Sequence, residues 1–471
     1  MFKLFIKQII EGKTTNHPVK PAEIIDARWY DRFEKLGSFQ AYKFFEGNKK
    51  FRDQQRKSFL NMDTRNPVFD YPLINQVEIQ IHSQEVIKLN RDISNKEKNP
   101  IVLHTYLPKI EEKLAELNLM KLAYKLSQEQ KSVNSEKLGK EFQIISEKLY
   151  GKPTEKLFAH SVAKTRAKIR LFIGKNAPTD AAAMDLLAVL PEIEEETFFS
   201  ALEKNQLEKY LARYFLIDDA LEMINLSEIG GMLGASEIKK YFEKLLLSMG
   251  ITDWKVKLAK NLMSISIDHQ NKQIIIPRWR KMNRDKLRML MVHEIGVHVR
   301  RRSNGENSPL KLLGLGLQGY ETGEEGLAGI CEDILKESYD ITFGSLVGYL
   351  SVGMVYGLDG VKRDFRDLFD ILHKFYRFKI VKNCENTEKM DLNKVDRKAK
   401  KLAWFRACRI FRGSGGAIKG VCFTKDIIYL KGRMCVWDQI RNESKELSRL
   451  FCGKYDPCNP EHVRILDELG M

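Results

Sequence analysis

The segment MVHEIGVHVRRRSNG, residues 291–305, constrains this chain more than any other stretch. A helix-start signal at Asn283 precedes it, so the segment is predicted to be helical. His293 and His298 lie within it at positions i and i+5. An α-helix turns about 100° per residue, so in a regular helix these two side chains would point about 140° apart. The segment can therefore bring both imidazoles to one site only if the helix is distorted.

Gly296 lies between the two histidines and would ease such a distortion, because glycine has no Cβ. Either a single-turn π-bulge or a local break would bring the imidazoles together, and π-bulges are common at functional sites. We expect a bulge near Gly296. The alternative is that His293 and His298 are unrelated side chains on an arginine-rich helix.

Acidic residues near the histidines supply the other parts of a possible metal site. Glu294 follows the first histidine, and the pair Glu324-Glu325 begins a second predicted helix. Catalytic zinc sites use three protein ligands and leave a position for water, whose proton a nearby carboxylate can accept. The common zinc-protease motif is H-E-x-x-H, so the spacing here is one residue longer. Carboxylates at a helix start are also favoured by the helix dipole alone, and the pattern does not choose between Glu324 and Glu325.

The first half of the chain is predicted to be helical. Apolar residues recur there at three- and four-residue spacing with charges between them. Examples lie at residues 39–62, 110–126 and 196–224, and a small amphipathic element is expected at 1–13. The uncharged run at 341–358 contains four glycines and several polar residues, so it is predicted to be a buried core helix rather than a transmembrane segment.

A short β-rich segment precedes the histidine helix. Residues 253–261 and 264–277 alternate apolar with polar side chains, which predicts short strands with a turn at 269–272. Strands followed by a metal-binding helix are typical of zinc peptidases, and an edge strand beside the cleft could pair with an extended peptide. We therefore expect an α+β, mainly helical fold with a zincin-like metallopeptidase core. The predicted regions are a mainly helical 1–245 and a catalytic 246–471.

The two segments HEIGVHVRRRSNG (293–305) and NSPLKLLGLGLQGYETGEEGLA (307–328) resemble the microtubule-associated tyrosine carboxypeptidases, zinc enzymes that remove C-terminal tyrosine from tubulin. The likeness is greater to their bacterial relatives, which carry a Gln-Glu-Gly-Leu-Ala motif. It continues through 406–432, where the family has an Arg-Gly turn followed by Thr-Lys-Asp and Tyr-Leu-x-Gly stretches. Weaker similarity lies at 66–72 and 149–153.

This resemblance implies a catalytic Zn²⁺ with three protein ligands: His293, His298 and Glu325. It also implies that Glu294 is the catalytic base. Two positions depart from the pattern of the relatives. Val297 stands where they usually have threonine, and Glu324 replaces the bacterial glutamine but matches the eukaryotic members. Neither position is a predicted ligand.

A carboxypeptidase must also hold the free C-terminal carboxylate of its substrate. Arginine suits this role because its guanidinium can donate two parallel hydrogen bonds. The candidate substrate-binding residues are Arg301, Asn304, Arg409, Arg412, Lys425 and Tyr429. For each basic residue among them, the alternative is an ordinary solvated surface charge.

The net charge of +16 favours acidic partners. Basic runs at 278–288 and 396–409 would attract an acidic polypeptide. Nucleic acid is the alternative, because Trp404 and Phe405 lie among basic residues and could stack on bases, but the chain has no known nucleic-acid-binding module. We therefore rank a nucleic-acid partner below an acidic polypeptide.

The cysteines predict a reducing compartment. All seven follow residue 330, and their odd number together with the lack of a secretory signal indicates a cytoplasmic protein with free thiols. Cys452, Cys458 and His462 lack a fourth ligand at zinc-finger spacing, so we interpret these cysteines as free thiols as well.

The sequence thus predicts a zinc-dependent carboxypeptidase that acts on peptide or protein C-termini, with tyrosine as a candidate terminal residue. One alternative is a catalytically silent regulatory or binding protein of the same fold, although such a protein would not need Glu294. Another is a metal-dependent hydrolase of non-peptide amides or esters, which zinc chemistry alone does not distinguish from a peptidase. The oligomeric state cannot be predicted from the sequence.

Overall fold

The computed structural model describes residues 23–37, 40–45, 47–129, 134–193, 230–260, 262, 264–335, 343–384 and 390–471. The element expected at 1–13 and the helix expected at 196–224 lie outside these residues. Within them the chain is mainly helical with a few short strands, as the sequence predicts.

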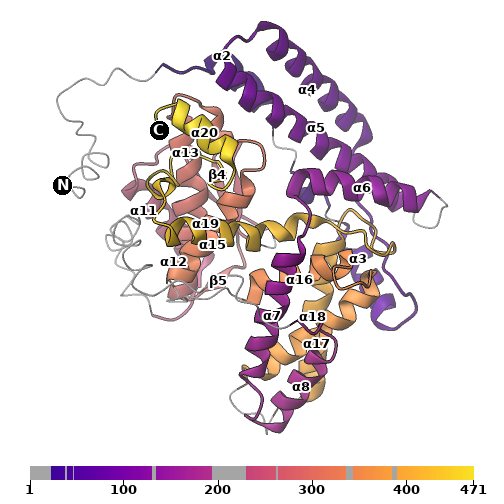
Figure 1. Ribbon diagram of the computed structural model, residues 1–471. Helices are drawn as coiled ribbons and strands as arrows, with labels where there is room; N and C mark the ends of the chain where they lie inside the picture. Colours follow the sequence, from indigo (N-terminus) through magenta and orange to yellow (C-terminus); the bar gives the residue numbers. More distant parts are fainter. Residues whose placement is uncertain are drawn as a thin grey trace.

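Helices dominate the N-terminal half, and their starts follow the sequence signals. Asn75 and Asn99 cap helices with their side-chain oxygens, and Pro100 occupies the first turn of the second of these, where a proline is well tolerated. Figure 1 shows α4 (Gln76–Lys96), α5 (Pro100–Gln128) and α6 (Ser135–Tyr150) along one side of the molecule. In chain order the elements are α2 (Ala27–Lys35), the 3₁₀-helix η1 (Ala41–Lys43), α3 (Lys49–Leu60), α4 (Gln76–Lys96), α5 (Pro100–Gln128), α6 (Ser135–Tyr150), α7 (Glu155–Arg170) and α8 (Ala177–Leu187).

The predicted strands and their turn are present. The three-stranded sheet has the order β2–β4–β3, with β2 parallel and β3 antiparallel to β4. Its strands are β2 (Lys255–Ala259), β3 (Ser266–Asp268) and β4 (Gln273–Pro277). A separate antiparallel pair is formed by β1 (Leu233–Gly234) and β5 (Lys281–Met282), and α11 (Ala235–Ser248) follows β1 in the chain. Among the residues that the structure describes, β3 pairs only with β4, so its other side is an edge of the sheet.

The C-terminal half follows the strands as a series of helices. Asn283 caps the first of them by accepting a hydrogen bond from the Lys286 backbone, as expected. In order they are α12 (Arg284–Leu290), the π-helix η3 (Met291–Val299), α13 (Arg300–Glu306), α14 (Leu312–Leu315), α15 (Glu321–Leu335), α16 (Phe343–Tyr356), α17 (Phe365–Val381), α18 (Leu392–Phe411), the 3₁₀-helix η4 (Thr424–Asp426), α19 (Ile427–Arg441), the 3₁₀-helix η5 (Lys445–Ser448) and α20 (Pro460–Glu468).

Two clusters of buried apolar side chains form the core. The larger joins the N-terminal helices to α16, α17 and α18, and the smaller joins the strands, α11 and η3 to parts of α15 and α19. The larger cluster takes side chains from both sides of residue 245, so packing connects the two predicted regions. Their standing as separate domains stays a prediction.

The uncharged run at 341–358 forms α16, whose side chains from 345 to 355 are buried. This confirms the predicted core helix. Among the described residues, no helix combines the length and hydropathy that a membrane crossing requires.

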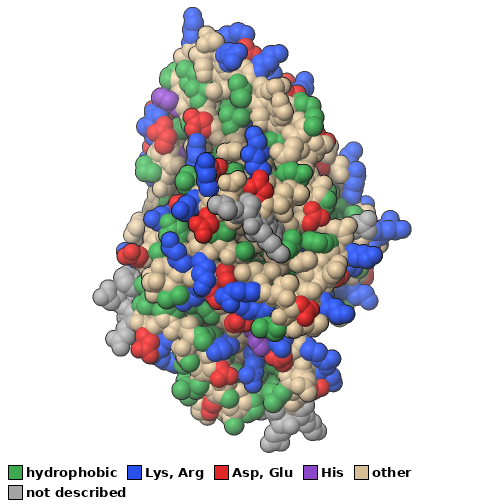
Figure 2. All heavy atoms as spheres, turned by 90° about the vertical axis from the view of Figure 1, so that its right-hand side faces the viewer, with side chains coloured by type: hydrophobic (Ala, Val, Ile, Leu, Met, Phe, Trp, Pro, Cys, Tyr) green, Lys and Arg blue, Asp and Glu red, His purple; other side chains and the backbone are tan. Residues whose placement is uncertain are grey.

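Charge on the face drawn in Figure 2 is mixed, because Lys and Arg side chains lie among Asp and Glu side chains. The two aromatic residues of the basic run at 396–409 differ in their exposure to solvent. Trp404 is buried in the core, whereas Phe405 is exposed. A stacking surface built from both rings is therefore not available, which weakens the nucleic-acid alternative.

Candidate active site

The predicted helix distortion is present at the histidines. Residues 291–299 form the π-helix η3, in which Gly296 is buried. The wider turn of this helix brings His293 and His298 together, with ring centroids 4.9 Å apart and an interplanar angle of 71°. Apolar neighbours of the histidines, such as Val292 and Ile295, pack into the smaller core cluster and hold the helix in place.

A carboxylate from the next long helix joins the two imidazoles. One potential ligand atom from each of His293, His298 and Glu325 lies within 4.8 Å of the others. Glu324, the alternative left open by the residue pattern, lies beside His298 and outside this group. Two imidazoles and a carboxylate at this spacing fit the donor set of a zinc ion with an open position.

Two glycines place Glu325 next to the histidines. A Cβ on Gly326 would lie 2.2 Å from the carbonyl carbon of Gly432, and a Cβ on Gly432 would lie 1.9 Å from the carbonyl oxygen of Thr322. Such distances are far inside van der Waals contact, so α15 and α19 can cross this closely only with glycine at both positions. This close crossing fixes the position of Glu325 on α15 relative to η3.

Each imidazole is oriented by a second carboxylate. His298 Nδ1 lies 2.8 Å from Glu324 Oε1, and His293 Nδ1 lies 3.0 Å from Glu332 Oε1. Metal-binding histidines commonly use one ring nitrogen for such a partner, which fixes the tautomer and leaves the other nitrogen for the metal. Sequence reasoning missed Glu332, although its place two helical turns after Glu325 puts both on one face of α15.

The site is rich in negative charge. Burial by itself lowers the pKa of His293, but the hydrogen bond that the imidazole donates to Glu332 and the charges of Glu294, Glu325 and Glu332 outweigh this effect and raise the pKa to about 9. The surroundings of this imidazole therefore favour a cation.

Glu324 is held in turn by two buried cations. Its Oε1 accepts a hydrogen bond from Lys454 Nζ at 2.8 Å, and its Oε2 lies 3.4 Å from Arg301 Nη1. Burial raises the pKa of Glu324, but the charge of Lys454, the hydrogen bond with His298 and the charge of Arg301 hold the pKa well below its usual range. Glu324 therefore stays ionised and continues to orient His298.

Two of the predicted substrate-binding residues, Arg301 and Asn304, lie outside the lining of the cleft. Arg301 is fully buried and donates hydrogen bonds to the carbonyl oxygens of Gly453 and Tyr455, both at 2.7 Å. The Asn304 side chain donates to the Phe451 carbonyl at 2.8 Å. Neither residue lines the cleft described next, because both turn toward the C-terminal segment behind the ligand helix.

A cleft of about 860 Å³ opens in front of the three potential ligands. This volume lies within the range of roughly 300–1,000 Å³ that is common for ligand sites. The edge strand β3 lines the cleft through Ser266 and Ile267, so a substrate backbone could reach the open side of the sheet. Glu294, the predicted base, also lines the cleft beside His293.

The remaining predicted substrate-binding residues lie at or near the cleft. Arg409, Arg412 and Tyr429 line it, and Lys425 forms an ion pair with Glu321, which is itself part of the lining. Arg409 Nε donates to Asp426 at 2.7 Å, and its guanidinium lies 5.2 Å from the centre of the Tyr429 ring. The C-terminal motif therefore supplies one wall of the cleft.

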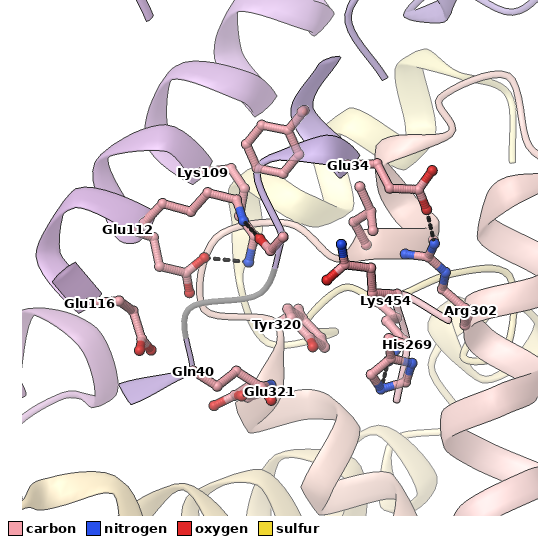
Figure 3. Close-up of a pocket in the computed structure, with 16 residues that line it drawn as sticks. Glu34, Gln40, Lys109, Glu112, Glu116, His269, Arg302, Tyr320, Glu321 and Lys454 are labelled. Carbon is pink, nitrogen blue, oxygen red and sulfur yellow. Dashed lines mark hydrogen bonds and ion pairs between the residues drawn. The ribbon is translucent and has the colours of Figure 1, made fainter. Parts of the chain in front are cut away.

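A smaller side pocket, drawn in Figure 3, adjoins the cleft and shares Tyr320, Glu321, Gln40 and His269 with it. Three of its cations are paired with carboxylates: Lys109 with Glu112, Arg302 with Glu34, and Lys454 with Glu324. A fourth, Lys113, donates a hydrogen bond to the Gly37 carbonyl. Because each cation already has a partner, we assign no charged ligand to the side pocket.

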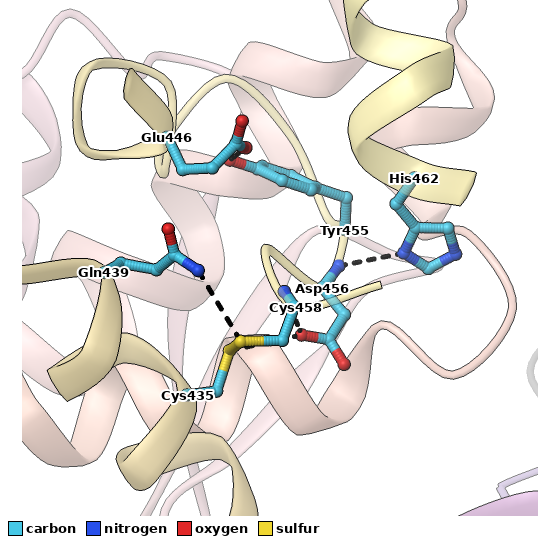
Figure 4. Close-up of a disulfide and its surroundings, with 7 residues drawn as sticks. All are labelled: Cys435, Gln439, Glu446, Tyr455, Asp456, Cys458 and His462. Atoms are coloured by element: carbon cyan, nitrogen blue, oxygen red, sulfur yellow. Dashed lines mark hydrogen bonds between the residues drawn. A yellow bond between two sulfur atoms is a disulfide. The ribbon is translucent and has the colours of Figure 1, made fainter. Parts of the chain in front are cut away.

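The prediction of free thiols is wrong for two cysteines. Cys435 on α19 and Cys458 form a disulfide, shown in Figure 4. Near this bond, the Asp456 backbone donates a hydrogen bond of 3.0 Å to His462 Nδ1, so His462 is held by the loop and not by the cysteines. Because a disulfide removes the argument from free thiols, a cytoplasmic location stays a prediction.

Comparison with known proteins identifies one family. A family model described as microtubule-associated tyrosine carboxypeptidase matches residues 211–342 and 391–471. The matched segments contain the three potential ligands, Glu294, Arg409 and Arg412. No curated protein and no solved structure gives a significant match.

Proposed function

The chain belongs to the microtubule-associated tyrosine carboxypeptidase family, and on this basis we propose that it is a zinc-dependent carboxypeptidase acting on peptide or protein C-termini. Tyrosine is the first terminal residue to test, because the description of the family names it. A zincin-like core and a cytoplasmic location are part of the same proposal.

One observation carries the proposal of zinc. His293 and His298, brought together by a π-helix, converge with Glu325, and the Nδ1 atom of each histidine lies within 3.0 Å of a second carboxylate oxygen. This arrangement leaves the two Nε2 atoms for a metal, as in other carboxylate–histidine–metal sites. Bound zinc would polarise the scissile carbonyl and lower the pKa of a water molecule to about 7.

The chain's own residues would carry the proton and hold the substrate. Glu294 lines the cleft next to a proposed ligand, so it can accept the proton of the attacking water and deliver it to the departing amine. Glu324 and Glu332 keep the imidazoles in the required tautomer. The open side of β3 can hold the substrate backbone as an added strand, with the scissile bond near Glu325.

Mass spectrometry of peptides ending in tyrosine, alanine or glutamate tests the reaction directly. We expect the wild-type protein to remove a single C-terminal residue, and Glu294→Gln to abolish this removal while retaining zinc. The proposal is overturned if zinc-loaded wild-type protein leaves all three peptides intact. If Glu294→Gln trims at the wild-type rate, Glu294 is not the base.

A further inference from the structure

The cations beside the cleft differ in whether they already have an anionic partner. Arg406 Nη1 and Arg409 Nε both donate to the carboxylate of Asp426, at 3.0 and 2.7 Å. Lys425 is paired with Glu321. Each of these three cations therefore has an anionic partner within the protein, although Arg406 and Arg409 share one carboxylate.

Arg412 is the exception in this wall. Within the described part of the chain, its side chain has neither a hydrogen-bond acceptor nor a carboxylate within ion-pair distance, and its Nε is buried. Burial, followed by the charge of Arg409, lowers the pKa of Arg412. A cation taken out of water without a partner is costly, so an anion at this position would be favoured strongly.

The surroundings of Arg412 hold its guanidinium in one orientation. The guanidinium carbon lies 5.3 Å from the centre of the Tyr42 ring and 4.9 Å from that of Phe423. Aromatic rings hold an arginine through cation–π contact and leave its N–H groups free to donate. The side chain is thus prepared to bind an anion before the anion arrives.

The backbone at Arg412 is fixed as well. Gly413 has a φ of 80° and donates its N–H to the Tyr71 hydroxyl at 2.6 Å. A Cβ on Gly413 would lie 2.8 Å from the rings of Phe142 and Phe45, so only glycine fits there. This tight turn follows the end of α18.

Arg412 faces the same cleft as the proposed ligands. Tyr42 and Tyr429 line this cleft together with Glu325 and Arg412. In a carboxypeptidase substrate the scissile carbonyl and the terminal carboxylate belong to adjacent residues, whose Cα atoms are about 3.8 Å apart. A carboxylate anchor must therefore lie on the metal-site cleft, one residue beyond the scissile bond.

We propose that Arg412 binds the free C-terminal carboxylate of the substrate and so makes the enzyme specific for unblocked C-termini. This inference rests on the proposed carboxypeptidase function. Two parallel N–H donors of the guanidinium would contact the two carboxylate oxygens. A C-terminal amide or an internal peptide bond offers no such anion, so neither would satisfy Arg412.

Matched peptides that end in tyrosine with a free acid or an amide test this specificity. We expect the wild-type protein to prefer the acid, and Arg412→Gln to lower kcat/KM for the acid at least about 30-fold, the lower end for breaking a buried charge pair. The amide rate should not change, so the acid-to-amide ratio falls. Arg412→Lys keeps the positive charge but lacks the two parallel N–H donors, so it should restore part of the acid-to-amide ratio. Arg464→Gln, a control at an exposed arginine, should match the wild type.

Binding measurements make the outcome independent of turnover. In a Glu294→Gln background, calorimetry should show tighter binding of the acid than of the amide, and this difference should disappear when Arg412→Gln is added. Arg412→Gln leaves no carboxylate unpaired, so its melting temperature should remain near that of the parent. An unchanged acid-to-amide ratio in rate and binding overturns the role of Arg412. If the wild type cleaves neither peptide but still binds the acid more tightly than the amide, the proposed reaction is overturned. The role of Arg412 in binding the carboxylate is not.

Discussion

Replacing Glu324 by glutamine should weaken zinc binding without touching a proposed ligand. Glu324 accepts hydrogen bonds from Lys454 and holds His298 Nδ1 at 2.8 Å. Glutamine has almost the same shape but carries no charge. The variant therefore keeps the packing of α15 and removes only the anion that orients the imidazole.

The expected losses follow from the burial of this network. Loss of a partner that orients a metal ligand typically lowers metal affinity about 10- to 100-fold. Stability should fall as well, because Lys454 and Arg301, each with a side chain 1% exposed, would lose their shared anion. Breaking a buried ion pair in this way costs about 3–5 kcal/mol.

Competition with a chelator measures the zinc affinity, and urea denaturation measures the free energy of unfolding. Glu446→Gln is the matched control, since Glu446 is also buried and pairs with Arg449 but contacts no histidine. It should lose stability and keep zinc affinity. The reasoning is refuted if folded Glu324→Gln binds zinc as tightly as the wild-type protein.

Three further changes test the fold around the site. Gly326→Val should cost about 3 kcal/mol through overpacking at the α15–α19 crossing and should lower the zinc content, as measured by denaturation and metal assays. Gly230→Ala, whose added Cβ meets open space, should have little effect on either quantity. Changing both Cys435 and Cys458 to alanine should lower the free energy of unfolding by about 3 kcal/mol, because the disulfide closes a loop with a sequence separation of 23. An unchanged urea midpoint would contradict this prediction. Burial lowers the pKa of His462 from 6.5 to about 4. Between pH 6.5 and pH 4 the unfolded chain therefore binds more protons than the folded protein does. The free energy of unfolding should fall by about 3 kcal/mol as the pH drops through this range. In His462→Gln this part of the pH dependence of unfolding should disappear, and its persistence would assign the effect to another group.

The parts of the site that follow from local sequence were predictable. The five-residue spacing of His293 and His298 with Gly296 between them requires a distorted helix, and η3 provides it. Alternation of apolar residues predicted β3 and β4, and the Asn283 cap marked the start of the helix. Each of these features depends on a few neighbouring residues, so one sequence is enough to predict them.

The supporting contacts were not predictable in the same way. Lys454 and Glu332 reach the histidines through packing between segments far apart in sequence. Arg301 follows the ligand helix and was interpreted as substrate-binding, but two backbone carbonyls draw it into the interior. Arg412 was one of several equal candidates until the ion pairs of its neighbours were known.

Zinc content tests the central claim most directly. Elemental analysis of the purified wild-type protein should give about one zinc per chain, the value for a single catalytic site. His298→Ala and Glu325→Ala, purified in parallel, should each have lost most of it while remaining folded. A folded wild-type protein without zinc after purification from zinc-supplemented cells, or full zinc content in both variants, would contradict the account.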